Sequence, residues 1–290
     1  MRLFPILAVL TGALTATPSL AQDATGAPPS PDQAIAAGLA KDTLTIGGGG
    51  VYLPDYEGSK DYRFTAAPAA IGSYKGFNFQ LIGNRFNLDL IPDSRHSNYD
   101  FQLGPVVVVN FDRETLSDID DPRVRALGKL GTAFEVGGFV GFGKTGIITS
   151  PYDKLSVSVS YRHDLSNVSD SNVITPSINY LTPLSLKAAV AFFASADHVG
   201  TGYARTYFGV TPQQSLASGL PVYYPNSGWK SFTVGGLATY SLTGNLLHGF
   251  KAVAGGTYTT MMGDVGNSPL IRIAGSGNQW LGAVGLAYTF

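Results

Sequence analysis

Residues 99–111 read YDFQLGPVVVVNF, and their two-residue alternation decides the fold class. The odd positions are mostly apolar and hold Tyr99, Phe101, Leu103, Pro105, Val107, Val109 and Phe111. The even positions, continued to 112, include Asp100, Gln102, Asn110 and Asp112. A two-residue repeat of about thirteen residues is longer than the usual globular strand. It predicts a long strand with one apolar and one polar face.

The same repeat recurs in residues 77–81, 86–90 and 155–161. Strands of about ten residues with this pattern are the signature of a transmembrane β-barrel. In lipid no backbone edge can stay unpaired, so the strands must close into a ring. The sequence therefore predicts an all-β protein, a transmembrane antiparallel β-barrel.

We expect about twelve strands, an even number of the kind that bacterial single-chain barrels have. The expected strands are 43–53, 62–75, 76–82, 85–91, 98–112, 131–143, 153–165, 172–181, 184–198, 229–242, 248–262 and 279–290. The connections that would face outward include the long ones, 54–61, 113–130, 199–228 and 263–278. The periplasmic turns are mostly short, which is the asymmetry such barrels show.

Composition argues against a soluble alternative such as a secreted β-sandwich or a lipocalin-like barrel. Only 13% of the residues are charged. The polar faces are rich in Ser, Thr, Asn and Gly and lack the Lys and Glu of a normal soluble surface. The formal net charge of -1 also argues against a nucleic-acid partner. We therefore expect the apolar face to meet outer-membrane lipid.

The N-terminus reads MRLFPILAVLTGALTATPSLAQD and predicts a secretory signal peptide over residues 1–21. The alternative, a membrane-spanning helix, needs roughly 20 apolar residues, and this run is shorter and contains Pro5. We expect cleavage near Gln22, a periplasmic N-terminal tail over 22–42 and a barrel over 43–290 in the cell outer membrane. There is no Cys, so a disulfide framework is excluded.

The C-terminal strand ends on an aromatic residue. Its lipid-facing positions include Leu286, Tyr288 and Phe290. This pattern resembles the C-terminal signal by which the barrel assembly machinery recognises its clients. That machinery is therefore an expected partner.

One motif suggests a nucleotide site but fails in context. Residues 138–145, GFVGFGKT, satisfy the phosphate-loop pattern, which requires a strand before it and a helix after it. Here the stretch lies inside an alternating strand, and Pro151 with a β-branched run follows, so we expect no nucleotide. We also find no catalytic set, no cofactor motif and no metal site, and expect a protein that is not an enzyme. The acidic run 118–121 is more typical of a solvated loop than of a calcium site.

The face opposite the lipid-facing set carries four positive and four negative side chains. They are Arg85, Asp89, Asp100, Glu135, Arg162, Lys187, Asp197 and Lys251. A balanced set favours an internal network over an ion-selective pore. Twelve strands also predict a narrow or plugged lumen. The long aromatic connection 199–228 would fold into or over the barrel mouth, or pack on neighbouring loops.

Three ordered segments resemble the MipA/OmpV family of Gram-negative outer-membrane proteins. They are VYLPDYEGSKDYRFTAAPAAIGSYKGF near the N-terminus, YFGVTPQQSLASGLPVYYPNSG in the long connection, and GDVGNSPLI followed by LGAVGLAYTF near the end. The resemblance spans residues 44–290. The matching loop residues include Asp55, Tyr56, Glu57, Gly58, Ser59, Arg63, Phe208, Gly209, Val210, Ser215, Tyr223, Ser268 and Pro269.

The resemblance implies a non-enzymatic outer-membrane barrel. Some members are described as scaffolds that link a murein lytic transglycosylase to a murein synthase. Others are linked to adhesion, osmotic response or antibiotic susceptibility, and the family has no settled catalytic residues. Three hypotheses follow: a murein-enzyme scaffold, a narrow or gated small-molecule channel, and a surface adhesin or receptor that acts through outer loops.

Overall fold

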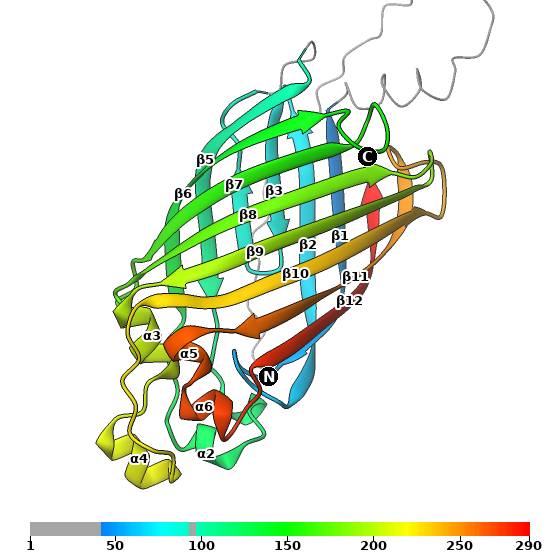
Figure 1. Ribbon diagram of the computed structural model, residues 1–290. Helices are drawn as coiled ribbons and strands as arrows, with labels where there is room; N and C mark the ends of the chain where they lie inside the picture. The colour runs from blue at the N-terminus through cyan, green and yellow to red at the C-terminus, as the bar shows by residue number, and fades with distance from the viewer. Residues whose placement is uncertain (1–41, 93–96) are drawn as a thin grey trace, which may run out of the picture.

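The computed structural model describes residues 42–92 and 97–290, and within them the chain forms a closed antiparallel barrel (Figure 1). Its strands are β1 (Thr43–Pro54), β2 (Tyr62–Tyr74), β3 (Phe77–Ile82), β4 (Arg85–Leu88), β5 (Tyr99–Asn110), β6 (Ala133–Thr145), β7 (Lys154–Asp164), β8 (Asn172–Pro183), β9 (Ala188–Val199), β10 (Gly228–Ser241), β11 (Gly249–Met261) and β12 (Asn278–Thr289). The predicted all-β transmembrane barrel of twelve strands is confirmed. The predicted signal peptide and the tail up to residue 41 lie outside the described residues.

Each strand pairs with its sequence neighbour, and β1 closes the ring against β12. At this seam the register runs from Thr45 opposite Thr289 to Tyr52 opposite Gly282. The first strand begins and the last strand ends at the same end of the barrel. Both chain ends of the barrel therefore emerge on one side, opposite the long connections.

The alternation places the apolar face outward, as predicted. Phe64, Trp280 and Val284 are among the exposed large side chains on this face. Stacked or tilted ring pairs such as Tyr52 with Phe64 and Tyr258 with Trp280 lie towards the outer ends of the strands. Aromatic rings gather at membrane interfaces because they combine an apolar body with a polar tip.

Short turns join the strands at the end where the chain termini emerge. Lys75 and Gly76 connect β2 to β3 with φ values of 53° and 87°. Two positive φ values are those of a two-residue hairpin whose twist matches its strands. This end has the short turns of a periplasmic face.

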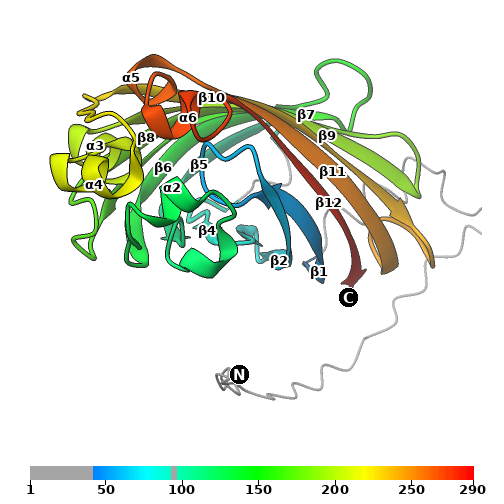
Figure 2. The same ribbon diagram turned by 90° about the horizontal axis from the view of Figure 1, so that it is seen from below.

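The opposite end carries the helices, which Figures 1 and 2 show gathered together at the long connections. They are the 3-10 helix η1 (Leu116–Asp118) and the helices α2 (Pro122–Arg125), α3 (Thr201–Phe208), α4 (Pro212–Ser218), α5 (Gly263–Gly266) and α6 (Pro269–Arg272). In the part of the chain that the structure describes, none of the helices has the length and apolarity that crossing a bilayer requires. These helices form a separate layer above the outer mouth.

Local capping explains where the helices begin. Thr211 and Gln214 form a reciprocal capping box at the start of α4, with Pro212 in its first turn. This arrangement satisfies backbone N–H groups that the first helical turn leaves free. Gly219 ends the same helix in the left-handed conformation, with φ 74°. The connection 199–228 is therefore an ordered helical segment.

Candidate functional site

The four long connections fold together into one unit, which we call the cap: residues 54–61, 111–132, 200–227 and 262–277. Two apolar clusters hold it together. The first joins the cap to the strand ends and includes Val173, Val199, Tyr203, Ala204, Tyr207, Phe208, Met261, Val265 and Ile271. The second lies within the cap and includes Tyr56, Ile119, Val124, Leu127, Val210, Leu220, Leu270 and Ala274. The long connection 199–228 thus both covers the mouth and packs on its neighbours.

The first family-like segment links the β1–β2 connection to two other parts of the cap. Asp55 accepts a hydrogen bond from the Asp120 N–H at 3.1 Å through its carboxylate. The Tyr56 hydroxyl donates to the carbonyl of Leu270 at 3.3 Å. Burial raises the pKa of Asp55 and the pKa of Tyr56 above their ordinary values. These contacts fix the connection in place between its neighbours.

Gly58 and Ser59 bring the same connection against the segment that precedes β12. Gly58 has φ 103°, and a Cβ there would lie 2.8 Å from Cγ1 of Ile271. Ser59 forms an isolated antiparallel bridge with Gly275. Only glycine combines this backbone conformation with so close an approach.

The second and third family-like segments meet each other. The Ser268 hydroxyl caps α6 by accepting the Leu270 N–H, and it donates to the Phe208 carbonyl at 2.6 Å. Val210 and Tyr223 form a two-way backbone bridge. The Tyr223 hydroxyl donates to the carbonyl of Asp264 at 2.8 Å.

The remaining family-like residues have separate places. Gly209 ends α3, where a Cβ would lie 2.4 Å from the Arg205 carbonyl oxygen. Ser215 lies half-buried on α4, and Pro269 is the first residue of α6. Arg63 on β2 forms an ion pair with Asp118 of η1. Most of the family-like loop residues therefore hold the cap together.

Beneath the cap lies a buried ion network. Lys230 of β10 contacts Glu57 of the cap and lies 3.2 Å from the carboxylate of Asp197. Arg162 pairs with Glu135 at 2.5 Å. The two halves are joined because Arg162 donates to the Thr175 hydroxyl, at 3.0 Å, and that hydroxyl donates to Asp197, at 2.6 Å.

Aromatic residues of α3 cover this network from the cap side. The Tyr203 hydroxyl donates to Glu57 at 3.1 Å, and the Lys230 ammonium lies 5.2 Å from the centre of the Tyr203 ring. Burial raises the pKa of Tyr203 and of Tyr207. Burying unpaired charges is costly, so the pairing of the charged groups in this network favours a fixed arrangement.

Asp112 and Arg113 link the network to the connection 200–227. The Asp112 carboxylate accepts the Glu57 N–H at 2.8 Å. Burial raises the pKa of Asp112 to about 6, although Arg113 lowers it in part. Arg113 is itself buried and donates to the carbonyls of Thr206 and Tyr207.

The structure divides the eight predicted lumen charges into two groups. Glu135, Arg162 and Asp197 belong to the buried network, and the field of all three acts on Arg85 nearby. Towards the periplasmic end, Asp100 pairs with Lys154 of β7 at 2.5 Å. Asp89, Lys187 and Lys251 also lie at that end. Asp89 accepts the N–H groups of Ile91 and Leu103, and the Lys251 ammonium donates to the Leu246 carbonyl. The Lys187 side chain is exposed in the turn between β8 and β9. The eight do not form one network.

Two members of the site were missed by the sequence analysis. Lys230 precedes a register shift in β10, where Trp229 pairs with His198 and Ser231 with Asp197. A bulge puts two successive side chains on one face, and both Lys230 and Ser231 are buried. Asp112 ended the alternating stretch but was not linked to Glu57. No signal in a single sequence shows where a bulge falls.

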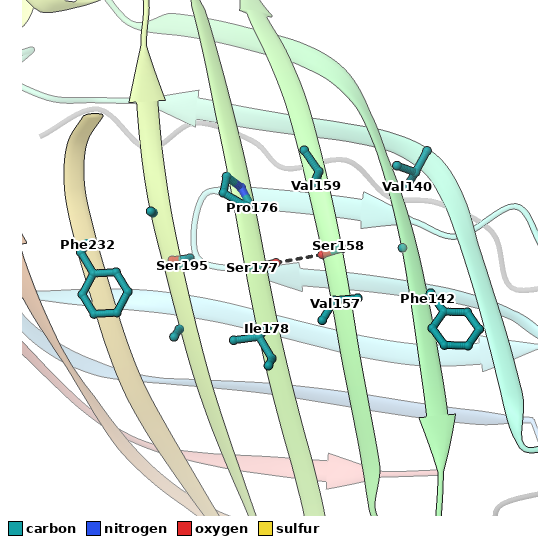
Figure 3. Close-up of a pocket in the computed structure, with 13 residues that line it drawn as sticks. Val140, Phe142, Val157, Ser158, Val159, Pro176, Ser177, Ile178, Ser195 and Phe232 are labelled. Atoms are coloured by element: carbon teal, nitrogen blue, oxygen red, sulfur yellow. Dashed lines mark hydrogen bonds between the residues drawn. The ribbon is translucent and has the colours of Figure 1, made fainter. Parts of the chain in front are cut away.

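A hollow lies on the barrel wall, across strands β6 to β10 (Figure 3). It has a volume of about 670 Å³. Its border includes the exposed, lipid-facing side chains Val140, Phe142, Val159, Ile178 and Phe232. The hydrogen-bonded pair Ser158 and Ser177 belongs to the same strands, on their other face. This apolar hollow offers lipid a surface and holds no group of catalytic chemistry.

The nucleotide-like motif GFVGFGKT lies within β6, and the turn that follows leads to β7. Within residues 42–92 and 97–290 there is no group of three His, Cys, Asp or Glu side chains placed to hold a metal ion. Asp121, which the sequence placed in a solvated acidic run, caps α2 and pairs with Arg123 at 2.6 Å. That ion pair lowers the pKa of Asp121.

Comparison with known proteins identifies the family of the chain. The family model described as "MltA-interacting protein MipA" matches residues 46–290. No curated protein matches. Among solved structures, the outer membrane channel DcaP of Acinetobacter baumannii is similar, with 9% identity, a TM-score of 0.37, and 86% of this chain and 96% of that chain covered. Outer-membrane expressed OmpT of Vibrio cholerae is similar with 7% identity, a TM-score of 0.35, and coverage of 86% and 97%.

Proposed function

The chain belongs to the MipA family of outer-membrane barrels, and on that premise we propose that it is a non-enzymatic scaffold for murein enzymes. The partner is a murein lytic transglycosylase, with a murein synthase as a second one. The observation that carries this proposal is the family match, which covers the barrel from residue 46 to its end. The name of that family describes interaction with MltA.

The geometry supports a role in holding a partner. The cap and the ion network lie together at the outer mouth, which favours a holding role over a wide pore. At the periplasmic rim, Lys75 and Lys187 are exposed in the short turns β2–β3 and β8–β9. The predicted tail 22–42 would end at this same rim, because β1 starts there. A periplasmic enzyme would bind the rim and the tail together.

Crosslinking in intact envelopes tests the scaffold. We expect a murein lytic transglycosylase to be captured with the wild-type barrel after detergent extraction. The double variant Lys75→Glu, Lys187→Glu, or deletion of residues 22–41, should reduce capture. Arg272→Gln, an exposed change on the cap, is the matched control. Equal capture by all forms, or no enzyme with the wild type, would contradict the scaffold.

A narrow or gated channel is the second candidate, favoured by one observation in the lumen. Ile71 pairs with Thr45 and Gln80, and Leu237 pairs with Ala191 and Gly255, so both belong to the inward face. Their exposed fractions are 46% and 43%. The lumen beneath the network therefore leaves space around these side chains, and the cap is its outer gate.

Single-channel recording in planar bilayers tests the channel. We expect small or absent steps from the wild type and larger steps after deletion of residues 203–224, which contain most of α3 and all of α4. Conductance that deletion leaves unchanged would argue against the cap as a gate. A folded deletion variant without conductance would argue against a channel.

A further inference from the structure

The barrel wall has a notch on one side. Strand β2 pairs with β1 over its whole length, Tyr62–Tyr74, but with β3 only from Ala69 onward. The β3–β4 hairpin ends at Gly83, whose N–H binds the carbonyl of Pro68. On the far side, β5 pairs with β4 only up to Val108. Residues 62–67 of β2 therefore have no neighbouring strand on that side.

The size of the notch follows from strand geometry. Two strands are missing between β2 and β5, so three spacings of about 4.8 Å leave a gap of roughly 14 Å. The six unpaired residues of β2 extend for about 20 Å at roughly 3.3 Å per residue. A gap of this size exceeds one strand and admits a chemical group of substantial size.

The notch lies within the outer half of the membrane-spanning wall. Phe64, which borders it, is 79% exposed and packs against Tyr52 of the outer aromatic set with the two rings tilted. An unpaired strand edge cannot face hydrocarbon, because lipid tails supply no hydrogen-bonding partner. Whatever fills the notch must therefore offer polar atoms at the level of the lipid headgroups.

The connection 111–132 borders the notch, and a pocket of about 240 Å³ lies between it and β2. The pocket is lined by Asp55, Arg63, Thr65, Phe111, Arg113, Glu114, Thr115 and Asp118. Phe111 is exposed at the end of β5, on the lipid side. The pocket therefore joins an apolar border to a charged interior, the arrangement that a lipid headgroup and its first carbons need.

Two arginines line this pocket with donors to spare. The Nε atoms of Arg63 and Arg113 are buried and have no hydrogen-bond acceptor among the described residues, although Arg113 Nε lies 4.0 Å from the Asp112 carboxylate as an ion pair. The Arg113 side chain is almost fully buried, and its Nη2 donates to two carbonyls of α3. A buried guanidinium with a free N–H favours an oxyanion, since such bonds are charge-assisted.

Three carboxylates share the pocket and determine how an anion could enter. Asp55 is engaged by the Asp120 N–H, and Glu114 is exposed at the rim. Asp118 pairs with Arg63, but its side chain is 41% exposed and η1, which carries it, is a single turn. Asp118 can therefore turn away to solvent and leave Arg63 to another anion.

We propose that the notch binds the phosphorylated headgroup of an outer-leaflet lipid, with Arg63 and Arg113 as the anion-binding residues. The phosphate displaces Asp118 from Arg63, and the acyl chains continue over Phe64 and Phe111. Asp118 is thus a competitor of the ligand. Its removal and the removal of Arg63 must have opposite effects.

Native mass spectrometry of the purified full barrel tests this site. The probes are a diphosphorylated diglucosamine lipid and its dephosphorylated form. We expect retention of the phosphorylated lipid to exceed that of the other by about tenfold. Arg63→Gln should abolish the preference, Asp118→Asn should increase retention several-fold, and Arg272→Gln should change nothing.

The outcomes separate binding from folding. Each variant is first checked for the heat-resistant gel mobility of a folded barrel, and Asp118→Asn keeps the test decisive if Arg63→Gln does not fold. Equal retention of the two lipids, or weaker retention by Asp118→Asn, would overturn the proposal. If an equal concentration of inorganic phosphate displaces the lipid, the pocket binds free anions, and the proposal of a lipid ligand is overturned.

Discussion

The Ser268 hydroxyl lies 2.6 Å from the Phe208 carbonyl oxygen, so one side chain joins two connections 60 residues apart in the sequence. Ser268 also caps α6. We expect Ser268→Ala to destabilise the cap by about 1–3 kcal/mol, because it removes the N-terminal capping side chain of α6 and leaves the buried Phe208 carbonyl unsatisfied. Chymotrypsin cleavage at the cap aromatics measures this. Ser215→Ala, within α4, is the control and should leave the cleavage rate unchanged.

Lys230 contacts one carboxylate from the cap and one from β9, and its loss should be severe. Lys230→Met leaves the half-buried carboxylates of Glu57 and Asp197 without their ammonium partner, at a cost of about 3 kcal/mol. Adding Glu57→Gln should recover part of that loss. A double-mutant cycle on urea midpoints gives the coupling energy, and additive effects of the two changes would show that the contact is not energetically significant.

Asp112 should make the stability of the barrel depend on pH. Its pKa is raised from 3.8 to about 6 by burial, so the folded state binds a proton that the unfolded state releases more readily. This contribution is fully present below pH 3.8 and is lost as the pH rises through about 6. In Asp112→Asn the urea midpoint should change less with pH between 3.8 and about 6 than it does in the wild type. The exposed change Asp120→Asn should keep the wild-type slope, and a slope unaltered in Asp112→Asn would refute the assignment.

Two glycines separate backbone strain from steric conflict. Gly219→Ala introduces a Cβ at φ 74° where no atom lies within 4 Å, so only the backbone conformation opposes it, by about 1 kcal/mol. Gly58→Ala adds a contact of 2.8 Å with Ile271 at φ 103°. We expect Gly58→Ala to lower the urea midpoint clearly more than Gly219→Ala does. Equal effects would mean that Ile271 moves aside without cost.

The alternation of residues was enough to predict the barrel because one face of each strand meets lipid. In β12 the outward residues run from Trp280 to Tyr288 in steps of two, and that pattern is visible without any structure. The same property explains the strand count, since each strand repeats the pattern and the turns interrupt it.

The cap and its network could be predicted only in outline, because their contacts join distant residues. Glu57 was noted for its family resemblance, but its partners Lys230 and Tyr203 are 173 and 146 positions away. Lys230 faces inward because of a bulge, which breaks the period that the prediction relied on. The division of the lumen charges likewise depends on depth along the barrel axis, which a two-residue repeat does not encode.

The cap spans the seam between the first and last strands. The connection after β1 binds the segment before β12 through the bridge of Ser59 with Gly275, and the Gln279 amide donates to the Ser59 carbonyl at 3.1 Å. Because Ser59 follows β1 and Gln279 belongs to β12, these bonds hold together the outer ends of the two strands that close the ring. The cap is therefore a clasp across the seam, and we expect a protease-resistant cap only in a barrel whose first and last strands are paired.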